Sequence, residues 1–285
     1  MKAKTIKSVL QKKHSEFVES ITDENVRELV RKNSIITGGS IVSMLLNEEV
    51  NDYDYYFTNK ETVQAVTEYY VTQFNKTHDC DAVVKEEGDR VTIFIQSQGV
   101  AGEMEGHEIG DEDVVEPVVA STDDELPKYR PVFLSTNAIS LSNKIQLVIR
   151  FYGEAEEIHS NYDFVHATCY WCSKDGHLEL PSAALEAIIT KELVYQGSKY
   201  PLASIVRTRK FIKRGWQINA GQYLKMVLQL NEMDLFDMNV LREQLTGVDA
   251  AYFFQVIDTV KEKQSINPEY KIDSMYLIEV INRIF

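Results

Sequence analysis

The spacing of hydrophobic and polar positions changes near residue 172 of the chain. Before that point, short apolar or alternating runs predict strands at 35–37, 52–57, 89–96, 137–142 and 144–153. Helical spacing predicts helices before Asn33 and over 40–46 and 61–74. The segment 161–171 has the pattern of a strand or of a strand joined to a helix. The first part of the chain therefore predicts a sheet with flanking helices.

After Trp171 the pattern becomes helical throughout, with glycine and proline between the segments. It predicts helices over 181–197, 202–215, 220–233, 239–247, 250–264 and 274–285. The predicted fold class is α+β, a mixed sheet with flanking helices followed by an all-helical domain. We place the first domain at residues 1–172 and the helical neck and body domain at 173–285.

Composition indicates a water-exposed globular protein rather than a membrane protein. Of 285 residues, 44% are hydrophobic and 26% are charged. No apolar run approaches the roughly 20 residues of a membrane span, and the lysine-dotted start lacks the apolar centre of a signal peptide. The three cysteines are too few for a disulfide framework, which suits a reducing compartment. We therefore predict a cytoplasmic protein with no membrane partner.

Charge is distributed unevenly along the chain. The net charge of −14 alone argues against a nucleic-acid partner, because proteins that bind phosphates usually carry a basic surface. An acidic segment near 99–131 contributes much of the negative charge, and we predict that it is a loop or insert outside the sheet. The stretch 191–214, in contrast, has seven basic residues and one acid, so its helix is a candidate phosphate-binding surface.

Candidate chemistry lies in the stretch 36–57. Gly38 and Gly39 form a tight turn between a short buried strand and a helix that begins at Ser40, an arrangement in which free N–H groups at the helix start can bind phosphate. Downstream, Asp52 and Asp54 lie two residues apart in an aromatic strand, so their carboxylates share one face. Carboxylate pairs of this kind hold hard divalent cations such as Mg²⁺.

These motifs resemble the nucleotidyltransferase superfamily that includes DNA polymerase beta, in particular the branch of tRNA CCA-adding enzymes and bacterial poly(A) polymerases. That branch has the pattern G-G-x-V-R-D-x-L-L-G-x-x-x-x-D-h-D-h, and residues 38–47 followed by 52–55 reproduce its spacing without a gap. The resemblance implies a nucleotidyltransferase palm domain. It also implies that Asp52 and Asp54 are catalytic and bind two Mg²⁺ ions, with Gly38, Gly39 and Ser40 at the nucleotide.

Two further segments extend the resemblance. Residues 201–216 are similar to the family's D-P-h-R-h-L-R-A-h-R-F segment, which implies that Arg207 and Lys210 bind nucleotide. Asp163 matches the aspartate of the family's R-R-D-F-T-I-N-A segment. It is a third catalytic carboxylate, a ribose contact or a surface strand residue. Lys213 and Arg214 follow on the same basic helix and are candidate RNA contacts.

The chain also departs from the family pattern. Val42 and Ser43 replace an arginine and an aspartate, and Asn161 and Tyr162 replace the two arginines before Asp163. Residues 199–203 lack all three side chains of the E-D-x-x-R element that dictates C and then A in the family. Accurate CCA addition is therefore not expected, and the base preference is open.

The leading prediction is a template-independent enzyme that adds ribonucleotides from an NTP, with ATP first among them, to the 3′ end of an RNA; tRNA is one candidate acceptor. Two alternatives remain. One is a nucleotidyltransferase that modifies a protein or a small molecule, or that cyclises nucleotides. The other is a non-catalytic nucleotide-binding interaction protein. The intact pair Asp52 and Asp54 argues against the non-catalytic alternative, because a degenerate site is expected to lose one carboxylate.

Overall fold

A computed structural model describes residues 1–78, 81–96 and 127–245, together with 257, 260–263, 265–267, 269, 275, 278, 279 and 282. The described chain divides into two compact units, the first ending at Gln196 and the second beginning at Gly197. The predicted boundary after residue 172 falls inside the first unit. Whether residues 1–172 fold independently is not tested by this division, so the domain boundary at 172 stays a prediction. Most of the acidic segment near 99–131 lies outside the described residues.

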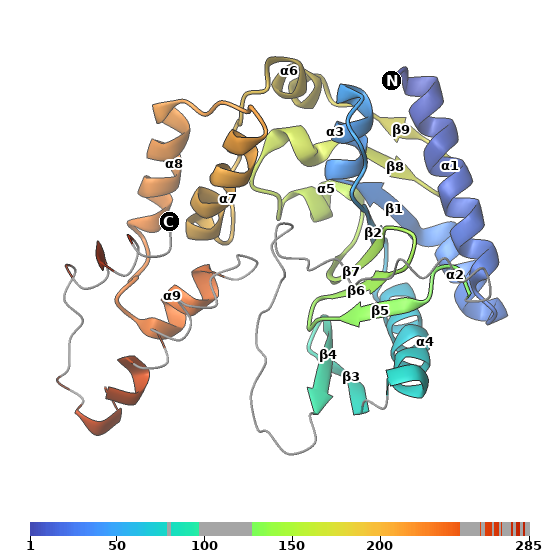
Figure 1. Cartoon of the computed structure of the whole chain (residues 1–285), viewed down its shortest axis with the longest axis horizontal. Helices are drawn as coiled ribbons and strands as arrows, with labels where there is room; N and C mark the ends of the chain where they lie inside the picture. Colours follow the sequence, from blue (N-terminus) through green and yellow to red (C-terminus); the bar gives the residue numbers. More distant parts are fainter. Residues whose placement is uncertain are drawn as a thin grey trace. The chain divides into compact units, whose positions relative to one another are not determined.

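A seven-stranded mixed sheet forms the centre of the first unit (Figure 1). Strands β2 and β7 are parallel, and every other neighbouring pair in this sheet is antiparallel. In spatial order the strands are β5 (Pro131–Leu134), β6 (Ala138–Leu141), β7 (Ile145–Tyr152), β2 (Tyr53–Phe57), β1 (Ser34–Thr37), β8 (Tyr170–Cys172) and β9 (Leu178–Glu179). Strands β3 (Asp81–Glu87) and β4 (Arg90–Gln96) form a separate antiparallel hairpin.

Helices cover both faces of this sheet (Figure 1). On one face, Phe17 of the first helix packs edge-on against Tyr55 with ring centroids 5.1 Å apart. On the other face, Ile35 and Tyr56 form a buried cluster with Ala155 and Ile158. The helices of this unit are α1 (Ala3–Ser20), α2 (Glu24–Asn33), α3 (Gly39–Leu46), α4 (Lys60–His78), α5 (Ala155–His159), the 3₁₀ helix η1 (Val165–Thr168) and α6 (Ser182–Thr190).

The second unit is helical in its described part. It contains α7 (Pro201–Lys213), α8 (Ala220–Leu230) and α9 (Met238–Gln244). Helix α7 buries Ala203, Ser204 and Thr208 and contacts the other two helices. Together the units confirm the predicted α+β class. The predicted helices over 250–264 and 274–285 lie largely outside the described residues.

One predicted helix is longer than the helix in the structure. The helix predicted over 181–197 ends at Thr190, because Lys191 takes a left-handed conformation with φ of 51° that closes it. The chain after Lys191 stays in the first unit, where Tyr195 forms a β-bridge with Phe164. The segment 161–171 contains η1 followed by β8, so of the two predicted alternatives it agrees with a strand joined to a helix.

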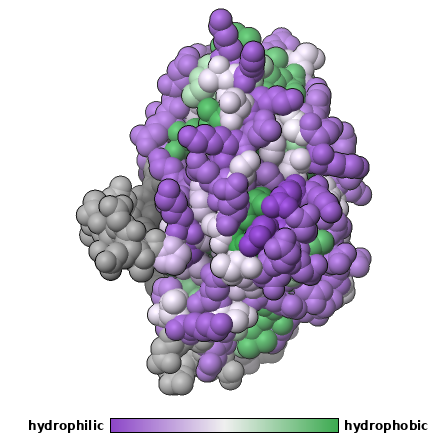
Figure 2. All heavy atoms as spheres, turned by 90° about the vertical axis from the view of Figure 1, so that its right-hand side faces the viewer, coloured by the Kyte–Doolittle hydropathy of each residue, from purple (hydrophilic) through white to green (hydrophobic). Residues whose placement is uncertain are grey.

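The surface around α1 is predominantly hydrophilic, with small hydrophobic patches between the polar side chains (Figure 2). No helix in the described ranges combines the length and the apolar character that a membrane crossing requires.

Candidate nucleotide and metal site

The turn between β1 and α3 forms the centre of the candidate site. Thr37 ends the strand, and Gly38 follows with φ of 83° and ψ of −144°. This backbone conformation favours glycine, because a Cβ atom makes positive φ costly. Helix α3 begins at Gly39, and no side chain caps its first turn. The N–H groups of that turn are therefore suited to an anionic ligand.

Asp54 lies directly beside this turn. Strands β1 and β2 pair in antiparallel register with Thr37 opposite Asp54. The Oδ2 atom of Asp54 lies 3.1 Å from the position that a Cβ atom would take on Gly38. A glycine at position 38 thus lets the backbone and the carboxylate approach each other, and any larger residue would push them apart. The half-buried carboxylate faces the start of a helix.

Asp52 lies in the loop before β2, and the strand begins one residue later than predicted. Lys144 holds this loop in place. Its Nζ donates to the Glu49 carboxylate at 2.8 Å and to the Val50 carbonyl at 2.9 Å, and its own carbonyl accepts from the Tyr53 N–H at 2.8 Å. Asp52 is half-buried in this loop, and its role as a metal ligand stays a prediction.

The residues around the turn fit a magnesium–triphosphate group. Ser40 is buried, and its Oγ has no hydrogen-bond partner among the described residues. The described residues contain no cluster of three or more His, Cys, Asp or Glu side chains suited to a metal ion. Two carboxylates are nevertheless the donor set expected for Mg²⁺, which keeps several waters and takes its other ligands from substrate phosphates. The room at Gly38 and the orphaned Ser40 hydroxyl suit the phosphate oxygens.

Three further residues reach this turn that the sequence did not single out. The hydroxyl of Tyr162 lies 3.8 Å from the same Cβ position on Gly38, and its ring packs against Tyr56 with centroids 6.1 Å apart. Burial raises the pKa of Tyr162 well above its usual value. Thr37 Oγ1 lies 2.8 Å from His159 Nε2, and burial lowers the pKa of His159 to about 4. The sequence contained one signal for Thr37, because this polar residue ends a strand that was predicted to be buried and is wholly buried in the structure.

The remaining predicted site residues are Asp163 and four basic residues. Asp163 is half-buried, and its carbonyl accepts the Gln196 N–H at 3.0 Å. Arg207 and Lys210 are half-exposed on α7, and Lys213 and Arg214 are exposed at its C-terminal end. All four basic residues belong to the second unit. Gly38, Gly39, Ser40 and Asp54 thus come together within one unit, and the roles of Asp163 and of the basic residues stay predictions.

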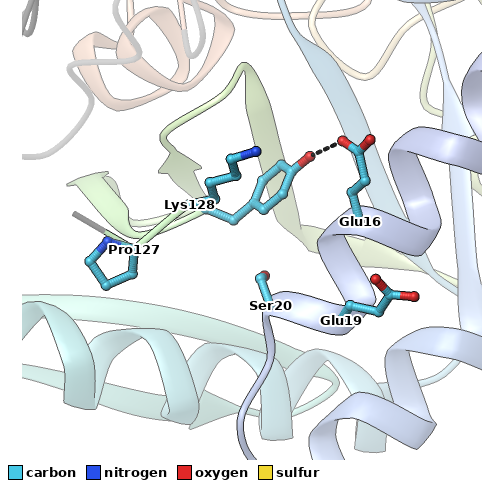
Figure 3. A pocket seen from close by; sticks show the side chains of 6 residues that line it. Glu16, Glu19, Ser20, Pro127 and Lys128 are labelled. Atoms are coloured by element: carbon cyan, nitrogen blue, oxygen red, sulfur yellow. Dashed lines mark hydrogen bonds between the residues drawn. The ribbon is translucent and has the colours of Figure 1, made fainter. Parts of the chain in front are cut away.

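A pocket of about 410 Å³ opens on the other face of the sheet (Figure 3). It is lined by Glu16, Glu19, Ser20, Pro127, Lys128 and Tyr129. The Tyr129 hydroxyl donates to Glu16 at 3.2 Å across it. Tyr129 packs on Phe17 of α1, the side of the sheet that Tyr55 faces, so this pocket is separate from the turn at Gly38.

Comparison with known protein families finds one family model that matches most of the chain. The model of the Gad2 family, described as the Gabija anti-defense 2 family, matches residues 8–191. The chain belongs to the Gabija anti-defense 2 family. A curated Gad2 relative, "Gabija anti-defense 2" of Bacillus phage SPbetaL7, is 18% identical over 243 residues. The match covers 85% of this chain and 48% of the relative, so the chain spans about half the length of that Gad2 protein.

Solved structures show a looser likeness to this Gad2 chain. The Thermotoga maritima CCA-adding enzyme complexed with tRNA is 11% identical with a TM-score of 0.40, over 92% of this chain and 57% of that one. A CCA-adding enzyme with CTP is 12% identical with a TM-score of 0.41, over 92% of this chain and 56% of that one. At these scores the likeness carries no argument about the activity of the Gad2 chain.

Proposed function

We propose that this Gad2 chain is a nucleotidyltransferase that transfers a nucleoside monophosphate from an NTP to the 3′ end of an RNA. The observation that carries the proposal is the convergence of the Asp54 carboxylate on the uncapped start of α3 at Gly38, 3.1 Å from the missing Cβ position. A phosphate bound by the helix start would lie next to a carboxylate that repels it unless a cation lies between them. This geometry suits a metal-bound triphosphate.

In this proposal the residues of the turn bind and orient the nucleotide. The N–H groups of Gly39 and Ser40 and the Ser40 hydroxyl bind phosphate oxygens, and the Gly38 conformation keeps the approach open. Asp52 and Asp54 hold two Mg²⁺ ions, which when bound supply charge neutralisation for the phosphates and activation of the acceptor hydroxyl. Asp163 is a further candidate at the ribose or the metal. Arg207, Lys210, Lys213 and Arg214 would contact phosphates of nucleotide or RNA.

The direct test is incorporation of labelled nucleotide. The protein is incubated with each labelled NTP, a total RNA pool and Mg²⁺, and the products are resolved by size. We expect Mg²⁺-dependent extension of RNA with release of pyrophosphate, and its loss in Asp52→Asn and Asp54→Asn. Asp89→Asn is the matched control, because Asp89 is an exposed carboxylate in the β3–β4 turn. Wild-type extension in either site variant would exclude the carboxylate pair as the metal site.

The same assay tests the choice of base. Residues 199–203 carry none of the three side chains that read the base in the resembling family, and Ala203 is fully buried in α7. We therefore expect relaxed nucleotide choice or addition of one base type. Faithful addition of C, C and A to a tRNA lacking its end would contradict this expectation.

A second candidate uses the same site with a protein acceptor. Membership of a family named for action against the Gabija defence, together with a net charge of −14, favours an acceptor other than RNA. In the assay above, label would then appear on protein instead of RNA when Gabija components are present. Asp54→Asn tests the site independently of the acceptor. If this variant labels neither RNA nor protein, the site is supported whichever of the two is the acceptor.

A further inference from the structure

The hairpin turn between β6 and β7 lies beside the start of β2. Strands β2 and β7 run parallel with Tyr53 opposite Ile145, so the residues that precede the two strands lie at the same edge of the sheet. Those residues are Asp52 before β2 and Lys144 before β7. The turn that carries Lys144 therefore reaches the loop that connects α3 to β2.

Lys144 makes hydrogen bonds on both sides of Asp52. Its Nζ donates to the Glu49 carboxylate at 2.8 Å and to the Val50 carbonyl at 2.9 Å. Its carbonyl accepts from the Tyr53 N–H at 2.8 Å. The hydrogen bond from Lys144 also lowers the pKa of Glu49, which keeps that carboxylate charged at neutral pH. One lysine thus holds the backbone two residues before Asp52 and one residue after it.

The beginning of the same loop has anchors of its own. The Glu48 N–H donates to the Ser43 carbonyl at 2.8 Å, and the Glu48 carboxylate lies 3.2 Å from Lys191 Nζ. Asp52 therefore lies between fixed points at residues 48–50 and at Tyr53. A short segment that is held at both ends has few backbone conformations open to it.

The turn that carries Lys144 is itself fixed. Ser142 exchanges two hydrogen bonds with Arg130, since its N–H donates to the Arg130 carbonyl at 2.9 Å and its Oγ accepts the Arg130 N–H at 3.0 Å. Lys13 of α1 donates to the Asn143 carbonyl at 2.6 Å. The Lys144 ammonium is therefore presented from a rigid base, which a side chain needs if it is to hold a loop in one position.

The backbone of Lys144 has a conformation that lysine does not favour. Its φ is 61°, and the φ of Asn143 before it is 63°. At positive φ glycine is unstrained and asparagine is tolerated, whereas a longer side chain adds strain. Glycine would relieve this strain at position 144 but could not reach Glu49 and Val50. The position thus combines a backbone cost with side-chain contacts to the loop that carries Asp52.

We propose that Lys144 is a positioning residue for Asp52, acting through the backbone of the loop before β2. Asp54 is held by the sheet, because its strand pairs with a neighbour on each side, whereas Asp52 precedes the strand and depends on the loop. This inference rests on the proposed function, since it assumes that Asp52 is a metal ligand. It deepens that function by naming the residue that sets the place of one carboxylate relative to the other.

The test measures the binding of Mn²⁺ alone to the full chain, without nucleotide, by electron paramagnetic resonance of the free ion. Lys144→Met removes the ammonium and keeps an unbranched side chain. We expect it to weaken Mn²⁺ binding about tenfold, as happens when other groups that orient a metal ligand are removed. Lys144→Arg should bind within about twofold of the wild type, because a guanidinium can donate to both acceptors. A lysine that acted only through its charge would repel the cation, so tighter binding in Lys144→Met would overturn the proposal.

Lys144→Gly separates positioning of Asp52 from support of the fold. Glycine relieves the positive φ, so this variant should melt within about 5 °C of the wild type and still bind Mn²⁺ as weakly as Lys144→Met does. Asn143→Gly is the matched control, because it places glycine one residue earlier and leaves the Lys144 ammonium in place. Its Mn²⁺ binding should be unchanged. Equal weakening by the two glycine substitutions, or a much lower melting temperature in Lys144→Gly, would make Lys144 a support of the turn and overturn the proposal.

Asp52→Asn separates failure of this inference from failure of the proposed function. If Asp52→Asn loses Mn²⁺ binding but Lys144→Met binds as the wild type does, Lys144 is not a positioning residue and the metal site stands. If Asp52→Asn binds Mn²⁺ as the wild type does, Asp52 is not a metal ligand, and the proposed function is wrong in its carboxylate pair.

Discussion

Gly38 and Gly39 are neighbours in the sequence but are subject to different structural constraints. Gly38 combines φ of 83° with an Asp54 oxygen 3.1 Å from its missing Cβ atom. Gly39 begins α3, and a Cβ atom added there would meet nothing within 4 Å. A pair of matched substitutions can therefore test whether the turn depends on one glycine or on both.

We predict that Gly38→Ala lowers the free energy of unfolding by about 1 to 3 kcal/mol, because it adds both a strained backbone angle and a contact with Asp54. Gly39→Ala should change it by less than about 1 kcal/mol, since a helical position accepts alanine. Urea denaturation of the two variants measures the difference. Equal destabilisation by the two changes would show that the positive φ at Gly38 is not required.

His14 gives a second prediction for a single residue. Its ring is buried between Tyr55 and Trp171, with centroids 6.1 Å and 5.2 Å away, and burial lowers the pKa of His14 to about 4. A histidine whose folded-state pKa is below its unfolded value of about 6.5 stabilises the fold above pH 6.5. That stability is lost as the pH falls toward 4, by about 2 kcal/mol between pH 7.5 and pH 5.

Denaturation at pH 7.5 and pH 5 tests this expectation. His14→Gln removes the titrating ring, so the variant should lose less stability between the two pH values than the wild type does. His78→Gln is the control, because His78 is exposed. An unchanged pH dependence in His14→Gln would show that its burial does not contribute to acid sensitivity.

The sequence predicted some residues of the site and missed others for a physical reason. Gly38, Ser40 and Asp54 lie within 17 positions of one another and follow local rules of turns, helix starts and strand alternation. Thr37 and His159 are hydrogen-bonded although 122 positions separate them in the sequence. Tyr162 lies close to Gly38 across a similar sequence separation. No local pattern reveals such contacts, because they depend on which strands pair in the sheet.

At the scale of elements, the spacing of hydrophobic residues predicted where helices occur, but it did not predict where they end. The predicted segments at 202–215 and 220–233 correspond to α7 and α8. The predicted helix over 181–197 continued too far, because a left-handed Lys191 gives no strong signal in the sequence. Strands β3 and β5 were not predicted, since β3 is rich in charged residues and β5 has only four residues.

Helix α7 gives a prediction at this scale. Arg207 and Lys210 lie three residues apart on the helix, on a different side from the exposed Arg209. If they contact phosphates, the double variant Arg207→Ala with Lys210→Ala should bind RNA more weakly and with a flatter salt dependence, because each phosphate contact releases counterions. Filter binding across a range of salt concentrations measures the slope.

Arg209→Ala is the control on the same helix. It removes one positive charge from another side of the helix, so it should change the salt slope by less than half of the change in the double variant. A slope that stays unchanged in the double variant would make Arg207 and Lys210 ordinary solvated surface residues. A slope reduced equally by Arg209→Ala would indicate non-specific attraction by the whole helix.

At the scale of the whole molecule, the segment 173–196 is part of the first unit. The Val165 N–H donates to the Val194 carbonyl at 3.0 Å, and Tyr195 bridges Phe164. Gln196 adds hydrogen bonds to the carbonyls of His159 and Tyr162. A protein cut at the sequence-based boundary would lose all of these contacts.

We therefore predict that a fragment of residues 1–196 folds cooperatively and that a fragment of residues 1–172 does not, or melts at a much lower temperature. Circular dichroism of the two fragments during heating gives the answer. The longer fragment serves as the positive control for expression and solubility. Equal melting of the two fragments would support a domain boundary at 172 and make the later contacts dispensable.

The way Thr37 and Gln196 make their hydrogen bonds affects how the chain can evolve. Thr37 donates to the carbonyl of Cys169, and Gln196 donates to the carbonyls of His159 and Tyr162. Backbone acceptors are the same whatever the side chain, so mutation of Cys169 can change its side chain without removing the acceptor. Genetic drift can therefore alter much of this region while the bonding pattern persists, which is one way for distant relatives to diverge without losing a shared geometry.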